Sequence, residues 1–156
     1  MAGTHIVERR EVKIVRKPVI AEVVPLARRP AYQAFMLLRV GYAILPIVAG
    51  LDKFLNLLST WEMYLSTPIE KILPVAPRTF MMVSGAVEIA AGLLVAIAPR
   101  IGAFVVAAWL AGITLNLLLP PGFYDIALRD FGLMIGALAL GLLARRYHGV
   151  RTPKAG

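Results

Sequence analysis

Four long apolar segments constrain this chain more than any other feature of its sequence. They cover approximately residues 34–58, 79–98, 101–119 and 124–144. Each is close to the ~20 residues that a helix needs to cross the hydrocarbon core of a bilayer. Only 17% of the residues are charged and the mean hydropathy is +0.75, whereas soluble domains are about 25% charged. The sequence therefore predicts an all-α integral membrane protein with a four-helix bundle, and it excludes an ordinary soluble enzyme.

The basic residues are unevenly distributed around these segments. Seven Lys or Arg residues precede residue 31, Arg100 lies between the second and third segments, and four basic residues follow the last segment. The loop 59–78 carries only Lys71 and Arg78. Because cytoplasmic loops of membrane proteins are enriched in Lys and Arg, we expect both termini in the cytoplasm and this loop outside. The net charge of +8 is then a topology signal, and a nucleic-acid-binding surface is not expected.

Three parts follow from this topology: a cytoplasmic N-terminal arm (1–33), the transmembrane domain (34–144) and a basic cytoplasmic tail (145–156). The arm mixes charges with β-branched apolar residues and contains Pro18, so a helix is not expected there. Two interpretations are open for the arm. It is either a solvated tail attracted to anionic lipid headgroups or a strap that docks on a partner subunit. The apolar content slightly favours docking of residues 8–25.

The outer loop contains two local helix-start patterns. Ser59 and Glu62 are spaced as in a capping box, and Thr67 and Glu70 repeat the spacing with Pro68 between them. The loop also contains aromatic residues of the kind that gather at membrane–water boundaries. We therefore predict short interfacial helices within the 59–78 loop.

Ionisable and amide side chains inside the apolar segments form the candidate functional site. Such groups are costly in hydrocarbon and normally face the bundle interior in pairs. With a rise of 1.5 Å per residue, most of them fall in one layer in the outer half of the membrane, and Arg39 lies toward the cytoplasm. We predict that Glu88 faces the interior and pairs with Lys53 or Arg129. The intramembrane polar residues are Arg39, Asp52, Lys53, Glu88, Asn116, Arg129 and Asp130.

Three interpretations of this polar layer are open: a structural ion-pair network, a polar pocket or proton relay open to the outer face, or basic side chains that only reach outer headgroups. No motif for nucleophilic catalysis is present, and no catalytic residue is predicted. The chain has no Cys, which excludes thiol redox chemistry and Cys-ligated metals. His5 and His148 lie near the termini, so haem held by two histidines in the membrane is excluded. A metal site is not expected, because three cations compete with any bound ion.

Several short motifs resemble those of a known family. Arg39–Gly41 followed by Gly50–Phe54 resembles the opening signature of DoxX-like membrane proteins, and Gly85–Glu88 with Gly92 is similar to the glycine–glutamate motif of that family. An acidic residue early in the fourth segment, here Asp130, also fits. The resemblance covers about residues 34–144. It implies a compact four-helix protein of the prokaryotic cytoplasmic membrane, with family polar positions at Arg39, Asp52, Lys53 and Glu88.

The resemblance also implies a class of function. Members of the family are often accessory subunits, and named relatives belong to a thiosulfate:quinone oxidoreductase and to membrane oxidoreductase assemblies. The first expectation is therefore an accessory subunit that anchors or stabilises other membrane subunits of a quinone-linked redox complex. The second is a quinone-binding enzyme subunit, in which Glu88 or Asp130 handles protons and Arg39 or Lys53 polarises a quinone carbonyl. The third is a small carrier. No tightly bound cofactor is expected, and quinone is the one candidate ligand.

Overall fold

The computed structural model describes residues 25–26 and 29–147. Most of the predicted docking segment 8–25 lies outside these residues, as do His5, His148 and the tail beyond Tyr147. The predictions made for those parts of the arm and tail are therefore not tested by the structure.

Four long helices make up most of the described chain, in which no strand occurs. All four are long and apolar enough to cross a membrane, which confirms the four predicted spans to within a few residues at each end. Proline stands at the start of the first three, where its missing N–H costs no hydrogen bond. The helices are α1 (Pro30–Leu55), α3 (Pro77–Ile97), α4 (Pro99–Leu118) and α5 (Tyr124–Tyr147).

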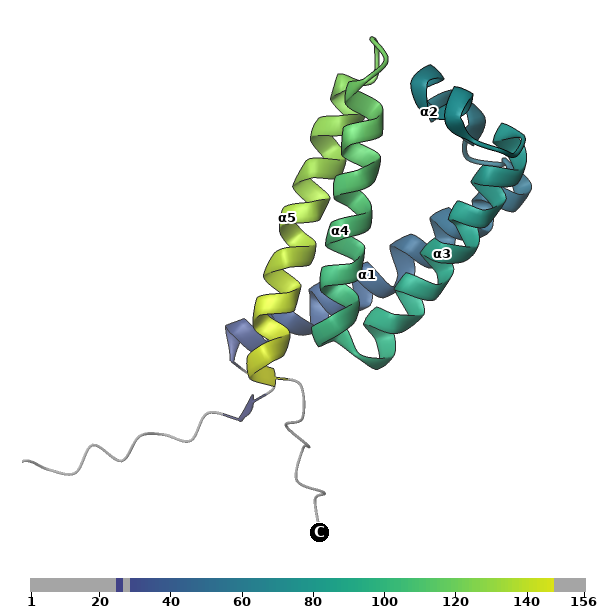
Figure 1. Ribbon diagram of the computed structural model, residues 1–156. Helices are drawn as coiled ribbons and strands as arrows, with labels where there is room; N and C mark the ends of the chain where they lie inside the picture. The colour runs from purple at the N-terminus through teal and green to yellow at the C-terminus, as the bar shows by residue number, and fades with distance from the viewer. Residues whose placement is uncertain (1–24, 27–28, 148–156) are drawn as a thin grey trace, which may run out of the picture.

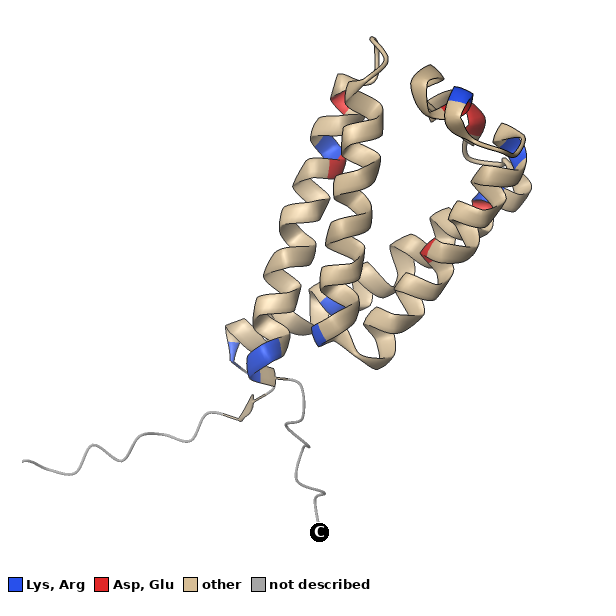
Figure 2. Ribbon diagram, viewed as in Figure 1, with Lys and Arg blue, Asp and Glu red and all other residues tan. Residues whose placement is uncertain are grey.

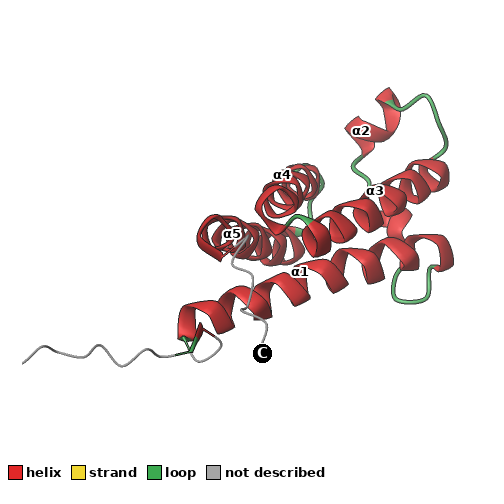
Figure 3. Cartoon of the chain, turned by 90° about the horizontal axis from the view of Figure 1, so that it is seen from below, coloured by secondary structure: helices red, strands yellow, loops and turns green. Residues whose placement is uncertain are grey.

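The long helices are arranged as two pairs, α1 with α3 and α4 with α5 (Figures 1 and 3). The pairs lie close together where α1 begins and α5 ends, which we call the terminal end of the bundle. They diverge toward the segment that joins α1 to α3, which we call the loop end (Figure 1). The fold is therefore an open V and not a uniformly packed bundle.

Aromatic side chains join the two pairs at the terminal end. The rings of Tyr32 and Phe35 on α1 lie 5.6 and 5.7 Å from the ring of Tyr147 on α5. Farther along α1, the hydroxyl of Tyr42 donates a hydrogen bond to the backbone oxygen of Leu133 on α5. These contacts hold α1 to α5 at this end of the bundle.

Two glycines allow α1 and α3 to approach each other closely near the loop end. A Cβ placed on Gly85 would lie 2.6 Å from the backbone oxygen of Gly50, and a Cβ on Gly50 would lie 2.5 Å from that of Gly85. Small residues permit such backbone contact between membrane helices. The pair brings the next turn of α1, which carries Lys53, against α3.

The segment between α1 and α3 contains a 3-10 helix, η2 (Trp61–Tyr64), and a short α-helix, α2 (Thr67–Ile72). Ser66 takes the N-cap position of α2, one residue before the predicted Thr67, and neither element has a side-chain cap hydrogen bond. The predicted capping-box contacts are therefore wrong. The position of these elements at a membrane surface stays a prediction.

Charged residues are unevenly distributed along the bundle (Figure 2). Among residues 29–147, the terminal end carries arginines and no carboxylate, whereas the loop end carries both signs. This agrees with the uneven charge distribution used to predict topology. The orientation of the termini stays a prediction.

Candidate functional site

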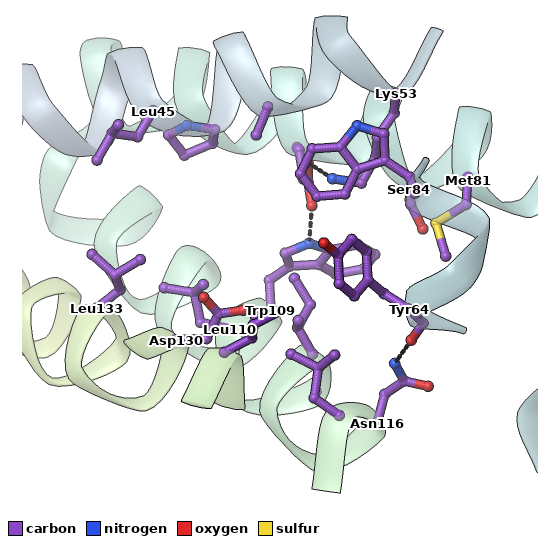
Figure 4. Close-up of a pocket in the computed structure, with 18 of the residues that line it drawn as sticks. Leu45, Lys53, Tyr64, Met81, Ser84, Trp109, Leu110, Asn116, Asp130 and Leu133 are labelled. Carbon is purple, nitrogen blue, oxygen red and sulfur yellow. Dashed lines mark hydrogen bonds and ion pairs between the residues drawn. The ribbon is translucent and has the colours of Figure 1, made fainter. Parts of the chain in front are cut away.

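A cavity of about 700 Å³ lies between the diverging helix pairs. All four long helices and the α1–α3 connection contribute to its walls, and most lining side chains are apolar. The size falls in the range of about 300–1,000 Å³ that is usual for small-molecule sites. Figure 4 shows the polar side chains that enter this otherwise apolar space.

A buried ion pair lies in the wall of the cavity. The Nζ of Lys53 is 2.7 Å from Oε2 of Glu88, and each side chain is 7% exposed. The indole N–H of Trp109 on α4 donates to Oε1 of the same carboxylate at 3.1 Å. The prediction that Glu88 faces the interior and pairs with a basic residue is confirmed, and the partner is Lys53. Both carboxylate oxygens thus have a donor (Figure 4).

Lys53 also lies against an aromatic ring. Its Nζ is 3.7 Å from the centroid of the Trp61 ring, a cation–π contact. Trp61 is half-buried and lines the cavity. The placement of the aromatic residues of this loop at a membrane–water boundary stays a prediction.

The side chain of Asp52 holds Trp61 and the backbone that follows the end of α1. Its Oδ2 accepts from the indole N–H of Trp61 at 2.7 Å, and its Oδ1 accepts from the backbone N–H groups of Leu57 and Leu58 at 3.0 Å. Asp52 is 5% exposed and is not among the residues that line the cavity. This member of the predicted polar layer therefore holds the chain reversal after α1.

Asn116 fastens the connecting segment to α4. Its Oδ1 accepts from the backbone N–H of Ser66 at 3.1 Å, and its Nδ2 donates to the backbone oxygen of Tyr64 at 2.6 Å. The ring of Tyr64 lies edge-on to Phe123, 5.3 Å between centroids. Because Tyr64 and Asn116 both line the cavity, these contacts place η2 and the start of α2 across its loop end.

Glu62 fastens the same segment to the α1–α3 pair. Its carboxylate accepts from Arg78 at 3.0 Å and from the side chain of Asn56 at 3.0 Å. A hydrogen bond from its own backbone N–H, followed by those from Arg78 and Asn56, holds the pKa of Glu62 below its usual value. Arg78 also donates to the backbone oxygen of Phe54 at 2.7 Å.

Asp130 lies in the α5 wall of the cavity (Figure 4). Its side chain is 13% exposed and its Oδ1 is 3.5 Å from Nε of Arg129. The Arg129 side chain is 68% exposed, and Arg129 also lines the open cavity. Arg129 is not the partner of Glu88.

Arg39 is the predicted polar residue farthest from this arrangement. Its Nη2 donates to the backbone oxygen of Ala96 at 2.6 Å, in the last turn of α3. A cation at a helix C-terminus is favoured by the helix dipole. Arg39 does not line the cavity. No group of three or more potential metal-ligating side chains occurs in the described part of the chain.

Trp109 and Tyr42 both line the cavity, although neither was predicted as a site residue. Trp109 carried a usable signal, because tryptophan is typical of membrane interfaces and this one lies well inside a span. A buried indole N–H needs an acceptor, and Glu88 on the preceding helix lies at a similar depth. Tyr42 bonds a backbone oxygen, which no side-chain pattern reveals.

Comparison with protein families, with curated proteins and with solved structures finds no match to this chain.

Proposed function

We propose that this chain is an integral membrane subunit of a larger quinone-linked redox complex, oriented with both termini in the cytoplasm of a prokaryote. In this proposal the cavity receives the ring of a quinone, and the chain also anchors its partner subunits. The resemblance of its motifs to DoxX-like proteins supports the quinone-linked assignment. The cavity supports ligand binding over a purely anchoring role.

The observation that carries the proposal is the composition of the cavity wall. A quinone has an apolar ring and two carbonyl oxygens that accept hydrogen bonds. The apolar walls suit the ring, and the ammonium of Lys53 has further N–H donors beyond the one directed at Glu88. Asp130 on the α5 wall offers a carboxylate that can exchange a proton with a reduced ring.

Tryptophan fluorescence provides a direct test. The chain has two Trp residues, and both line the cavity. We expect decylubiquinone to quench the emission of the detergent-solubilised protein saturably. A soluble tryptophan ester in the same micelles supplies the control for collisional quenching, which does not saturate.

A double substitution separates binding from stability. Lys53→Met with Glu88→Leu replaces the ion pair by apolar groups of similar size, an exchange that buried pairs tolerate. We expect this variant to fold and to lose saturable quenching. Glu62→Gln with Arg78→Gln removes an ion pair outside the cavity lining and should retain it. Saturable quenching that persists in the cavity variant would refute the quinone site. If the wild type itself shows no saturable quenching, the quinone site is also refuted and only the anchoring role remains.

A further inference from the structure

A second, shallower depression lies at the terminal end, on the opposite part of the bundle from the cavity. It has a volume of about 460 Å³ and lies between α4 and α5. We call it the arginine groove. Its lining residues are Arg100, Ile101, Phe104, Val105, Ala108 and Arg145.

The polar part of the arginine groove carries only positive charge. Arg100 lies in the first turn of α4 and Arg145 in the last turns of α5. Neither forms an ion pair with a carboxylate within residues 29–147. The guanidinium of Arg145 lies 5.4 Å from the centroid of the Phe104 ring, and Arg145 is exposed. Guanidinium edges match phosphate oxygens.

The apolar part of the groove runs along α4. Ile101, Val105 and Ala108 follow one another at helical spacing, and Ile101 and Val105 are 61% and 41% exposed. From Ile101 to Ala108 the helix advances about 10 Å. The groove therefore has its charges at the helix ends and its apolar surface extending toward the middle of the span, the polarity of a phospholipid in the leaflet at that end.

The α5 side of the groove is shaped to receive Phe104. A Cβ on Gly141 would lie 2.8 Å from the Phe104 ring, so only glycine leaves room for the ring where it now lies. The ring in turn lies under Arg145. This contact holds one of the two cations over the groove.

We propose that the arginine groove binds an anionic phospholipid, with its phosphate between Arg100 and Arg145 and an acyl chain along Ile101, Val105 and Ala108. Basic pockets between membrane helices are suited to such headgroups. The proposal does not depend on the quinone site, since the two depressions share no lining residue.

Lipid titration of the purified full chain tests the proposal. We expect phosphatidylglycerol to remain bound in native mass spectrometry and to raise the unfolding temperature saturably, whereas phosphatidylcholine with the same chains does neither. Arg100→Gln with Arg145→Gln should weaken phosphatidylglycerol binding by about tenfold or more, because both cations that face the phosphate are lost. A tenfold loss corresponds to about 1.4 kcal/mol. Arg129→Gln with Arg146→Gln removes the same charge outside the groove and should bind as the wild type does.

Three results would overturn the proposal. Equal weakening in both double variants would show that net charge alone attracts the lipid. Equal retention of both lipids would show that the headgroup is not recognised. Inorganic phosphate that raises the unfolding temperature as much as phosphatidylglycerol would show that a free anion is sufficient, so that the acyl-chain contact plays no part.

Phe104→Leu keeps the apolar wall but removes the ring beneath Arg145, and it should give an intermediate affinity.

Discussion

Lys53 and Glu88 are 35 residues apart in the chain, yet Nζ of one lies 2.7 Å from Oε2 of the other. The pair joins α1 to α3 just beyond the contact between Gly50 and Gly85. Trp109 adds a contact from α4 to the same carboxylate. One buried charge pair thus links three of the four long helices at the edge of the cavity.

Removing one member of this pair should be far more harmful than removing both. Lys53→Met leaves the Glu88 carboxylate buried without its cation, and we expect a loss of about 3–5 kcal/mol in the free energy of unfolding. Lys53→Met with Glu88→Leu should recover most of that loss. Unfolding of both variants in mixed detergent micelles provides the measurement. A single variant as stable as the double variant would contradict the role given to the pair.

The spans and the Lys53–Glu88 pair could be predicted because they depend on quantities that a sequence contains. Hydropathy locates the helices, and counting residues from a span end gives the depth of a side chain. Depth alone placed Glu88 level with both Lys53 and Arg129. It could not say that Arg129 is largely exposed and pairs with Asp130 instead, because that depends on how α5 is rotated against its neighbours.

The roles of Asp52 and Asn116 were not predictable in the same way. Both were assigned to an intramembrane polar layer, and both hold backbone groups of the α1–α3 connection. The partners are amides and carbonyls that every residue carries, so no pattern of side chains marks them. The divergence of the two helix pairs, which creates the cavity, is likewise a property of packing and not of hydropathy.

The predicted topology can be tested with single engineered cysteines, since the chain has none of its own. Lys71 on α2 is exposed, so a cysteine at this position in the predicted outer loop would be accessible to a labelling reagent. We expect Lys71→Cys in intact cells to react with a membrane-impermeant maleimide and Arg146→Cys to react only after permeabilisation. The opposite pattern would invert the topology.

Loss of Asn116 should loosen the segment that covers the loop end of the cavity. Asn116→Ala removes two hydrogen bonds, and at about 1 kcal/mol each the opening free energy should fall by about 2 kcal/mol. Hydrogen exchange of the backbone amides in residues 64–73 measures this opening. Thr114→Val is a suitable control, because the Thr114 hydroxyl bonds only within α4, to the backbone oxygen of Leu110. Unchanged exchange in Asn116→Ala would show that Asn116 does not hold the segment.

Glu62 should make the stability of the same segment depend on pH. Its pKa is lowered in the folded protein from the usual 4.5, by its own backbone N–H and then by Arg78 and Asn56. A lowered pKa means that the ionised carboxylate stabilises the fold above about pH 4.5 and that this contribution is lost as the pH falls through the lowered value. The wild type should therefore unfold at a higher temperature than Glu62→Gln at pH 7, and the difference should shrink below pH 4.5. The exposed Glu70→Gln is the matched control for the loss of one carboxylate, and its unfolding temperature at pH 7 should stay close to that of the wild type.

The contact between Gly50 and Gly85 should be intolerant of a single methyl group. In Gly85→Ala the new Cβ would lie 2.6 Å from the Gly50 backbone oxygen, so α1 and α3 must separate and Lys53 must move away from Glu88. Gly132→Ala on α5 is the matched control, since nothing lies within 4 Å of its Cβ position and Gly132 does not line the cavity. Alanine favours a helix over glycine by about 1 kcal/mol, so Gly132→Ala should unfold at or slightly above the wild-type temperature. We expect Gly85→Ala to unfold at a clearly lower temperature and to weaken decylubiquinone quenching, whereas equal behaviour of the two variants would show that α1 and α3 do not touch here.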